Sequence, residues 1–505
     1  MQVTQSEHGA LSQRQLWLLF LGALTLHVLP LVLADYPYMD DIWRSLVAGR
    51  IQGEADSWAA QGRVLIDWLF AALGGGGALD LFPLPLLLVL PVVAKALAAL
   101  TAHYFERPGM SHALVVLALW YNPFFLQNLS YQYDAPGMAL ALAACVWAIV
   151  SGAGAMGRWL LGSVLIAAAL ALYQPSLSVF AILCCVEVIH RSGRDARFAQ
   201  VAGRLGARIV QLLVGGVIYW LTAYQLLNVP RTAMLPLNAQ WPGEMLARLE
   251  IIAQFIVHLA TPGNTWLIVA LVVLALVGLQ LIVRDVMLGP QTVKEKAGLV
   301  FLLLLQVPAT LLLIPGMILL FSSFGPGPRM LMGAGGALLL LLLLARRALV
   351  AVHPQLAWGV ALPLLLLLSL SFALGRVMVL QKELQQRVMF TLASAIDTYP
   401  ALQSIHRFHL HRASSKGLWL PAASGTLEAL PVLRDIHHIR YWLLPESTPR
   451  AGLDGFYGTS LADTRRLLSG HPSRVVDTRL FTIYVVDGEG HVVMKSPPAI
   501  EHLYE

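Results

Sequence analysis

The run Trp17–Ala34, WLLFLGALTLHVLPLVLA, contains no Asp, Glu, Lys or Arg, and it decides the class of fold. Its length approaches the roughly 20 apolar residues that a helix needs to cross a bilayer. Similar runs recur along the chain, in which 57% of the residues are hydrophobic and only 12% are charged. Soluble domains carry about 25% charged residues, so the composition indicates a membrane protein. The run is longer than the apolar core of a typical signal peptide, and we expect it to be retained as a first helix.

The apolar runs predict eleven membrane-spanning helices. They cover residues 16–34, 82–103, 111–126, 136–153, 159–173, 177–190, 209–228, 264–283, 298–320, 330–345 and 354–376. If the N-terminus is cytoplasmic, the cytoplasmic loops hold thirteen Lys and Arg residues, and the outer loops up to residue 329 hold six. The positive-inside rule therefore predicts a cytoplasmic N-terminus, and an odd number of spans places the C-terminus outside.

The composition changes after residue 376. The segment 381–402 has a helical period, and SRVVDTRLFTIYVVDGEGHVVMKS (Ser473–Ser496) predicts two strands joined at Asp487–Gly490. Residues 403–413 and 436–445 are also strand-like. We therefore expect an all-α polytopic membrane domain over 1–376 and a small periplasmic α/β domain over 377–505.

Two other kinds of site are disfavoured. His409 and His411 would share one strand face, but no cysteine joins them and the spacing matches no zinc signature, so no metal is expected. The net charge of +6 comes from arginines in short loops, without a basic strip interleaved with aromatic residues. Nucleic acid is therefore not an expected partner.

Unusual polar residues gather in the predicted outer loops. The first such stretch is DYPYMDDIWRSLVAGR (Asp35–Arg50), which follows the first span directly. A carboxylate of Asp40 or Asp41 at the membrane surface can act as a general base, and Arg44 can hold a phosphate. The alternative is a solvated Asp–Arg pair on a helix surface.

Further candidates lie in three later loops. YNPFFLQNLSYQYDAPG (Tyr121–Gly137) crowds amides, tyrosines and a carboxylate into one short loop, as sugar-binding sites do. An interfacial aromatic belt explains its tyrosines but not its amides or its aspartate. The polar corner at Tyr173 and Gln174 and an arginine at a predicted helix start, Arg329, complete the set. The sugar or acceptor candidates are Asn128, Tyr131, Gln132, Tyr133, Asp134, Tyr173 and Gln174, and the phosphate candidates are Arg44, Arg63 and Arg329.

Together these stretches resemble the Gtr-type glucosyltransferase family (glucosyltransferase II), inner-membrane enzymes that add glucose to the O-antigen of lipopolysaccharide. The stretches are MDDIWR (Met39–Arg44), GRVLIDWLF (Gly62–Phe70), NPFFLQNLSYQYDAPGMAL (Asn122–Leu140), LYQPSLSVF (Leu172–Phe180) and PRMLMG (Pro328–Gly333). The resemblance implies a GT-C fold, a polyprenyl-phosphate-linked hexose as donor, a periplasmic glycan as acceptor, and transfer with inversion. It also implies a flippase and a donor synthase as partners, no cofactor, and Asp40 or Asp41 as the base. Of the two aspartates we favour Asp41.

Two other classes of function stay open. A transporter or flippase of lipid-linked sugars would need ionisable groups at mid-membrane depth, where Lys95 and Glu187 are the chief exceptions to apolar spans. A non-catalytic partner in envelope assembly would use the C-terminal part as its binding module.

Overall fold

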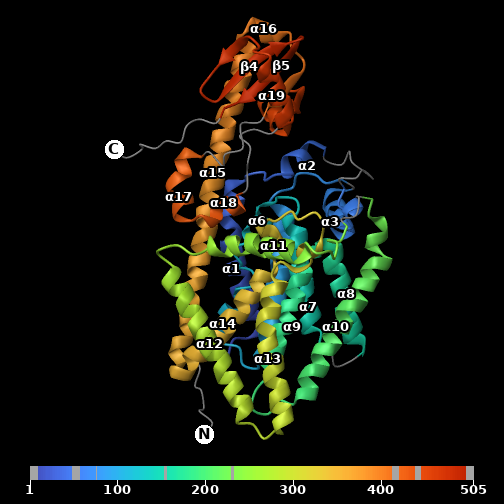
Figure 1. The fold of residues 1–505 in the computed structure, drawn as a ribbon, viewed down its shortest axis with the longest axis vertical. Coiled ribbons are helices and arrows are strands. Elements are labelled where there is room, and N and C mark those ends of the chain that lie inside the picture. The colour runs from blue at the N-terminus through green and yellow to red at the C-terminus, as the bar shows by residue number, and fades with distance from the viewer. Residues whose placement is uncertain are drawn as a thin grey trace. The chain divides into compact units, whose positions relative to one another are not determined.

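The structure is a computed structural model (Figure 1) that describes residues 10–47, 57–75, 77–152, 156–228, 233–411, 420–437 and 445–495. The chain forms two compact units. The bundle unit comprises residues 1–32 and 48–372, and the sheet unit comprises residues 33–47 and 373–505. Two of the three boundaries fall inside helices, α1 (Gln13–Ala34) and α15 (Ala361–Thr398), and the third follows the last residue of α2 (Asp41–Val47). The domain boundary predicted at residue 376 also lies inside α15 and stays a prediction.

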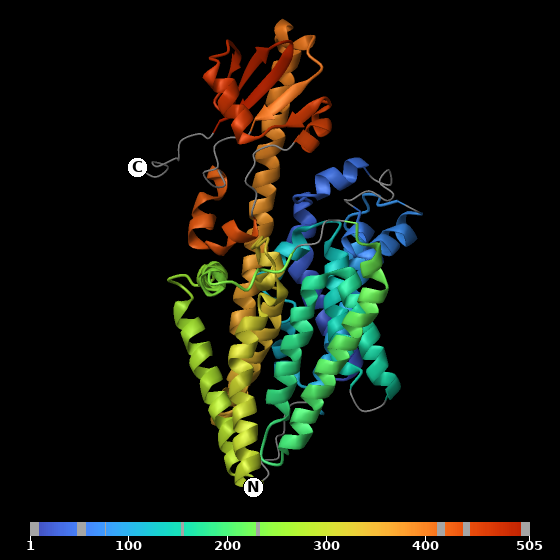
Figure 2. The same cartoon turned by 45° about the vertical axis from the view of Figure 1, so that its right-hand side comes forward.

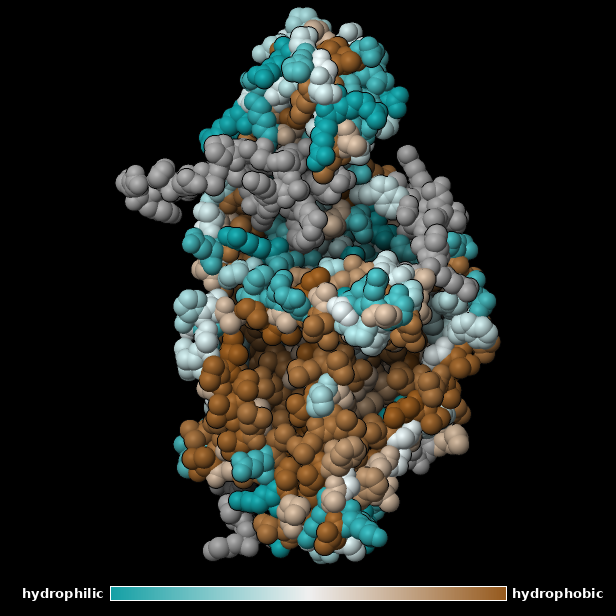
Figure 3. All heavy atoms as spheres, in the orientation of Figure 1, coloured by the Kyte–Doolittle hydropathy of each residue, from teal (hydrophilic) through white to brown (hydrophobic). Residues whose placement is uncertain are grey.

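Seven helices among the described residues are long and apolar enough to cross a membrane. They are α1, α4 (Leu84–Tyr104), α10 (Phe198–Leu221), α12 (Thr265–Met287), α13 (Val293–Leu313), α14 (Gly333–Val352) and α15. Figure 3 shows a broad hydrophobic band over the helices of the bundle unit on the displayed face. The chain is therefore a polytopic membrane protein, as its composition predicts.

Three shorter helices also belong to the bundle unit, and two of them are largely buried. α7 (Ala135–Val150), α8 (Met156–Leu172) and α9 (Leu177–Arg191) have 16, 17 and 15 residues. Nearly all side chains of α7 and α9 are buried, because α7 packs against α4 and α8 while α9 packs against α13 and α14. These helices coincide with predicted spans but are shorter than the seven above. The number of eleven spans therefore stays a prediction.

The prediction of one continuous helix over residues 111–126 is wrong. α5 (Met110–Leu117) ends early, and α6 (Phe125–Ser130) begins only after Pro123. Proline lacks an amide hydrogen and disfavours helical backbone in the residue before it, which here is Asn122. The Asn122 amide instead donates to the carbonyls of Leu331 and Met332 at 3.3 and 3.4 Å.

Two further helices of the bundle unit lie outside the candidate spans. α3 (Val64–Gly74) contains most of the stretch GRVLIDWLF and begins directly after Arg63. α11 (Trp241–Val257) runs crosswise to α12 and α13 in both ribbon views (Figures 1 and 2). Arg248 fixes α11 by donating to the carbonyls of Leu319 and Phe321 at 2.8 and 2.6 Å. The sequence predicted only a loop here.

The sheet unit contains a five-stranded sheet in the order β2-β1-β5-β4-β3. The strands are β1 (Phe408–His411), β2 (Phe456–Gly458), β3 (Arg474–Asp477), β4 (Phe481–Val486) and β5 (Glu489–Met494). β1 is parallel to β2 and β5, and β4 is antiparallel to β3 and β5. The turn at Asp487 and Gly488, both with positive φ, confirms the predicted hairpin. The prediction of two strands in this segment is incomplete, because β3 is a third.

The two faces of the sheet differ in chemistry. The apolar face, with Phe408, Leu410 and Ile483, packs against Val388 and Leu392 of α15. Since alternate residues of a strand face opposite sides, the histidines of β1 lie on the other face, near α19 (Leu461–Ser469). The remaining helices are α2 (Asp41–Val47), α16 (Pro400–Gln403), α17 (Ser424–Ala429) and α18 (Val432–Ile436). Most of the strand predicted at 436–445 lies outside the described residues.

Candidate functional site

Four segments of the bundle unit, all from predicted outer loops, meet at one end of its helices. They are the turn around Arg63, the residues following Asn128, the 3-10 turn η2 (Gln174–Ser176) and the 3-10 turn η5 (Pro328–Met330). Hydrogen bonds connect the first segment to the third and the second and third to the fourth. Loops far apart in the sequence therefore build one site, called the arginine site below.

Arg329 is held on all sides by the polar residues of this site. Its backbone N–H donates to Gln127 Oε1 at 2.7 Å, and its carbonyl accepts from Asn128 Nδ2 at 3.1 Å and from the Tyr173 hydroxyl at 3.4 Å. Its guanidinium donates to the Tyr131 hydroxyl and lies 5.2 Å from the centre of that ring. Arg329 lies in η5, before α14 begins, and not at the helix start that the sequence predicted.

Arg63 also contacts Tyr173, the tyrosine whose hydroxyl donates to the Arg329 carbonyl. Its Nε donates to Gln174 Oε1 at 3.2 Å, and its guanidinium lies 4.9 Å from the centre of the Tyr173 ring. Gln174 Nε2 in turn donates to the carbonyl of Gln61 at 3.0 Å and to the Tyr219 hydroxyl at 3.2 Å. Tyr173 thus joins the two arginines, with its ring against one and its hydroxyl on the backbone of the other.

Gly62 sets the direction in which Arg63 leaves the turn. Its φ of +74° is a left-handed conformation that glycine adopts without strain. A Cβ atom at this position would lie 2.5 Å from the Tyr219 hydroxyl. The close approach of Tyr219 to the backbone therefore requires glycine here.

Most of the predicted sugar-binding side chains are buried and packed within the protein. Those less than 9% exposed are Asn128, Tyr131, Gln132, Tyr133, Asp134 and Tyr173. Asp134 accepts a hydrogen bond from Trp58 Nε1 at 2.5 Å, and the Trp58 and Tyr133 rings both pack on Phe70. Arg63, Gln174 and Arg329 are only half-buried. The half-buried groups can reach a ligand directly, while the buried ones brace them.

The predicted site residues Asp40, Asp41 and Arg44 belong to the sheet unit, whereas the arginine site belongs to the bundle unit. Asp41 is the first residue of α2 and is 1% exposed, and its carboxylate accepts the backbone N–H of Tyr38 at 2.8 Å. Asp40 is exposed. Met39, which lies between Tyr38 and the two aspartates, has a φ of +51°. The turn is therefore strained, and Asp41 stabilises it.

Distant residues of the sheet unit hold this turn. The Tyr38 hydroxyl donates to the carbonyl of Ile436 at 2.7 Å, and Tyr38 is fully buried. Tyr36 and Tyr38 both pack against His437, with ring centres 5.6 and 6.2 Å apart. Lys382 of α15 pairs with Asp35 at 3.1 Å. The segment after the first span is therefore anchored on the C-terminal part of the chain.

The histidines of the sheet form a hydrogen-bonded cluster. His411 Nε2 lies 3.0 Å from His491 Nδ1, His409 stacks on His491, and His409 pairs with Glu489. Burial, and then the neighbouring His491 and His409, lower the pKa of His411 to about 4. Across the described ranges, no three His, Cys, Asp or Glu side chains are arranged to hold a metal ion.

Three residues that form hydrogen bonds with the predicted site residues were not predicted from the sequence. Tyr219 comes from a helix predicted only as a membrane span, and Trp58 was not among the candidates predicted in the first outer loop. Gln127 lies in the polar loop but was not singled out as a site residue. The glycine before Arg63 was the one local signal for a close approach such as that of Tyr219.

The arrangement defines a class of protein: a polytopic membrane protein with a cationic, aromatic and amide-rich site at one end of its apolar helices. Guanidinium groups at such a place suit a phosphate, and amides and aromatic rings suit a sugar. Residues 29–341 match the family described as "Glucosyl transferase GtrII", and the chain belongs to this family. The match includes every predicted site residue and ends before the sheet.

One curated relative adds to this result. An "Uncharacterized 55.3 kDa protein in gtrB 5'region" of Salmonella phage P22 is 28% identical over 203 residues. The alignment covers 40% of this chain and 41% of the phage protein. The chain thus matches about two fifths of the length of that relative. No solved structure matches the chain.

Proposed function

We propose that the protein is an inverting glycosyltransferase of the GT-C class that moves glucose from polyprenyl phosphate to a lipopolysaccharide O-antigen or related envelope glycan. Membership of the GtrII glucosyl transferase family supports the sugar. The single observation that carries the proposal is the arginine site, where Arg63 and Arg329 meet at Tyr173 at one end of the bundle unit. We place this end at the periplasmic face of a bacterial inner membrane, following the distribution of Lys and Arg.

The reaction needs a base, an attacking hydroxyl and a leaving phosphate. An aspartate takes the proton of the acceptor hydroxyl while its oxygen attacks the anomeric carbon of the donor. The bond from that carbon to the phosphate oxygen breaks, and its electron pair leaves with polyprenyl phosphate. Because attack and departure occur on opposite faces, the anomeric centre is inverted. The negative charge that develops on the phosphate is stabilised by guanidinium groups.

We assign the donor phosphate to Arg63 and Arg329. Their aromatic and amide partners fix both side chains in advance, so less conformational entropy is lost when the phosphate binds. Arg44 stays a candidate for this role. Asn128, Tyr131 and Tyr173 hold the arginine site together, and Gln174 is half-buried and able to reach a sugar hydroxyl.

We assign the base to Asp40 and a positioning role to Asp41. A base must reach the acceptor, and the exposure of Asp40 supports this choice. Asp41, which the sequence favoured, is buried and accepts the Tyr38 N–H. A flippase and a donor synthase would supply the lipid-linked sugar.

The test is glycosyl transfer by purified, lipid-reconstituted protein, using polyprenyl phosphoglucose and a panel of O-antigen acceptors. Wild type is compared with Arg329→Gln, Arg63→Gln, Asp40→Asn and, as a control, Asp80→Asn, an exposed aspartate outside both sites. We expect the arginine variants to raise the KM for the donor and Asp40→Asn to lower kcat. Transfer at wild-type rates by all three variants would refute the assignments. Absence of transfer by wild type with every donor and acceptor would favour a transporter of lipid-linked sugars.

A further inference from the structure

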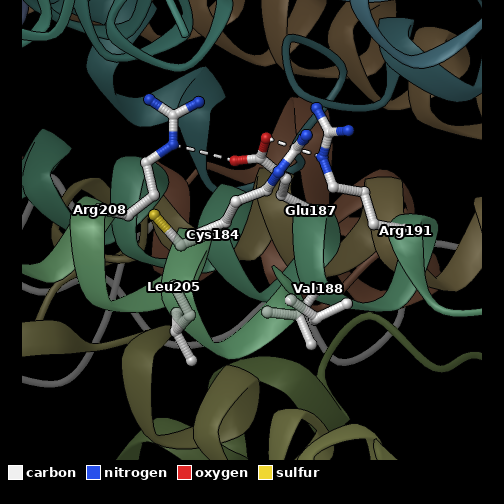
Figure 4. A pocket seen from close by; sticks show the side chains of 8 residues that line it. Cys184, Glu187, Val188, Arg191, Leu205 and Arg208 are labelled. Carbon is white, nitrogen blue, oxygen red and sulfur yellow. Dashed lines mark hydrogen bonds and ion pairs between the residues drawn. The ribbon is translucent and has the colours of Figure 1, made fainter. Parts of the chain in front are cut away.

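A second cluster of arginines surrounds a pocket between α9 and α10, far from the arginine site (Figure 4). The space among its lining side chains is about 200 Å³ when the open solvent at its mouth is counted, so the pocket is open to solvent and not an enclosed cavity. Its lining consists of Cys184, Glu187, Val188, Arg191, Val201, Arg204, Leu205 and Arg208. Tyr173 lies before the 3-10 turn η2 that leads into α9, and Glu187 lies ten residues after Leu177, the first residue of α9. At about 1.5 Å per residue, the pocket is therefore some 15 Å or more along the helix from the arginine site.

One carboxylate serves as the partner for most of the positive charge in this pocket. Glu187 Oε2 accepts from Arg208 at 2.9 Å, and Oε1 accepts from Arg191 at 3.1 Å (Figure 4). His103 lies 3.6 Å from Oε1. Three arginines face a single acidic residue in the lining, so the pocket keeps a net positive charge.

Arg208 is buried, is held mainly by partners within the protein, and has a structural role. Besides Glu187, its guanidinium donates to Gln211 Oε1 and to the carbonyls of Ala148 and Ile149, at 2.7 to 3.1 Å. It is only 2% exposed. It therefore fixes α10 against α7 and α9, with four of its five N–H groups used within the protein.

Arg191 and Arg204 differ from Arg208 in this respect. Arg191 is 33% exposed and uses only its Nε in the pair with Glu187. Arg204 is exposed, and no described residue forms a hydrogen bond or ion pair with it. The terminal nitrogens of both side chains remain available at the pocket, and a guanidinium offers two parallel donors to phosphate oxygens.

The position of the pocket along α10 indicates which phosphate can reach it. Ile209, Val210 and Leu213, directly after the pocket residues of α10, are 50%, 50% and 62% exposed, as expected for side chains facing lipid. Arginines at the end of such a span lie at the depth of phospholipid head groups. By the distribution of Lys and Arg, this end is the predicted cytoplasmic one.

We propose that the pocket between α9 and α10 binds the phosphate group of an anionic phospholipid through Arg191 and Arg204. The site is separate from the arginine site and independent of the proposed transfer reaction. Its ligand chemistry is an anionic phosphate group, which free phosphate shares with a lipid head group.

The test uses full-length protein in detergent, titrated with phosphatidylglycerol, with phosphatidylcholine or with inorganic phosphate, and followed by native mass spectrometry and thermal unfolding. We expect saturable binding of phosphatidylglycerol at least tenfold tighter than that of phosphatidylcholine. Arg204→Gln removes charged hydrogen bonds to the phosphate and should weaken binding by about tenfold or more. Because Arg204 has no protein partner among the described residues, this variant should fold normally.

Arg194→Gln is the matched control, since Arg194 is exposed, lies on the connection between α9 and α10, and does not line the pocket. Its affinity for phosphatidylglycerol should stay within about twofold of wild type, because a solvated surface charge contributes little. Competition by inorganic phosphate would identify a small anion as sufficient, and its absence would identify the lipid. Equal losses of phosphatidylglycerol affinity in Arg194→Gln and Arg204→Gln would overturn the proposal. So would the absence of saturable binding of both phosphatidylglycerol and inorganic phosphate.

Discussion

The division of labour between Asp40 and Asp41 can be tested with substitutions that separate chemistry from packing. Asp41→Ala removes a buried carboxylate that accepts the Tyr38 N–H at 2.8 Å. A hydrogen bond to a charged group contributes about 1.5–3 kcal/mol, and a neutral one about 0.5–1.5 kcal/mol. Asp41→Asn keeps a neutral acceptor, so it should lose about half of the stabilisation lost by Asp41→Ala.

The consequence for activity differs between the two positions. If Asp41 only holds the turn, Asp41→Asn should slow transfer by about tenfold or less, since about 1.4 kcal/mol corresponds to a factor of ten. Asp40→Asn removes the proposed base, for which losses of about 10²–10⁴ in rate are typical. Because Asp40 is exposed, its replacement should leave thermal stability unchanged.

The assay is the initial rate of glucose transfer in proteoliposomes, with unfolding temperature measured on the same preparations. The decisive quantity is the ratio of the kcat of Asp40→Asn to the kcat of Asp41→Asn. A loss above about 10² in Asp41→Asn, with near-wild-type rates in Asp40→Asn, would refute the reasoning and return the base to Asp41.

Three further predictions concern other parts of the molecule. Gly62→Ala places a Cβ against Tyr219 at a φ of +74° and should raise the KM for the donor, whereas Gly75→Ala, at +68° with nothing within 4 Å, should not. The positive φ should cost both substitutions about 1–2 kcal/mol in stability, whereas only the substitution at Gly62 displaces Tyr219 and, through Gln174, Arg63. Equal KM values would contradict the role of these contacts in donor binding. The pKa of His411, about 4 against 6.5 for an ordinary imidazole, means that the unfolded state binds more protons between these values. Stability of the sheet should therefore fall as pH falls from about 6.5 to 4, and a thermal melt series should show a weaker fall in His411→Gln; an unchanged pH profile in that variant would exclude His411 as the cause. Tyr38→Phe removes only the hydroxyl that donates to Ile436 and should lower stability by about 1 kcal/mol in chemical denaturation, and a variant as stable as wild type would argue against that contact.

Local signals predicted the elements that depend on neighbouring residues. Asp487 and Gly488 can adopt positive φ, and the hairpin between β4 and β5 forms there. The sequence predicted Arg63, Gln174 and Arg329 in loops on one side of the membrane, and the structure brings these three residues together.

Features that depend on distant partners were not predictable. The start of α10 at Phe198 lies among arginines that indicated a loop, and α11 lacks the continuous apolar run of a span. The partner of Tyr38 lies 398 residues away, and no local pattern at either residue indicates the other. The same separation explains why the sequence could not distinguish a buried Asp41 from an exposed Asp40.

The hydrogen bond from Tyr38 to Ile436 also affects when this part of the chain can fold during synthesis. Chains are made from the N-terminus and their parts fold as they emerge, so Tyr38 leaves the ribosome long before its partner exists. The turn that carries both aspartates cannot reach its final packing until the last quarter of the chain has been made. A nascent or truncated protein that already has its first spans in the membrane therefore still lacks the finished turn. The segment that carries Asp40 and Asp41 therefore reaches its finished fold only after the chain has been made as far as Ile436.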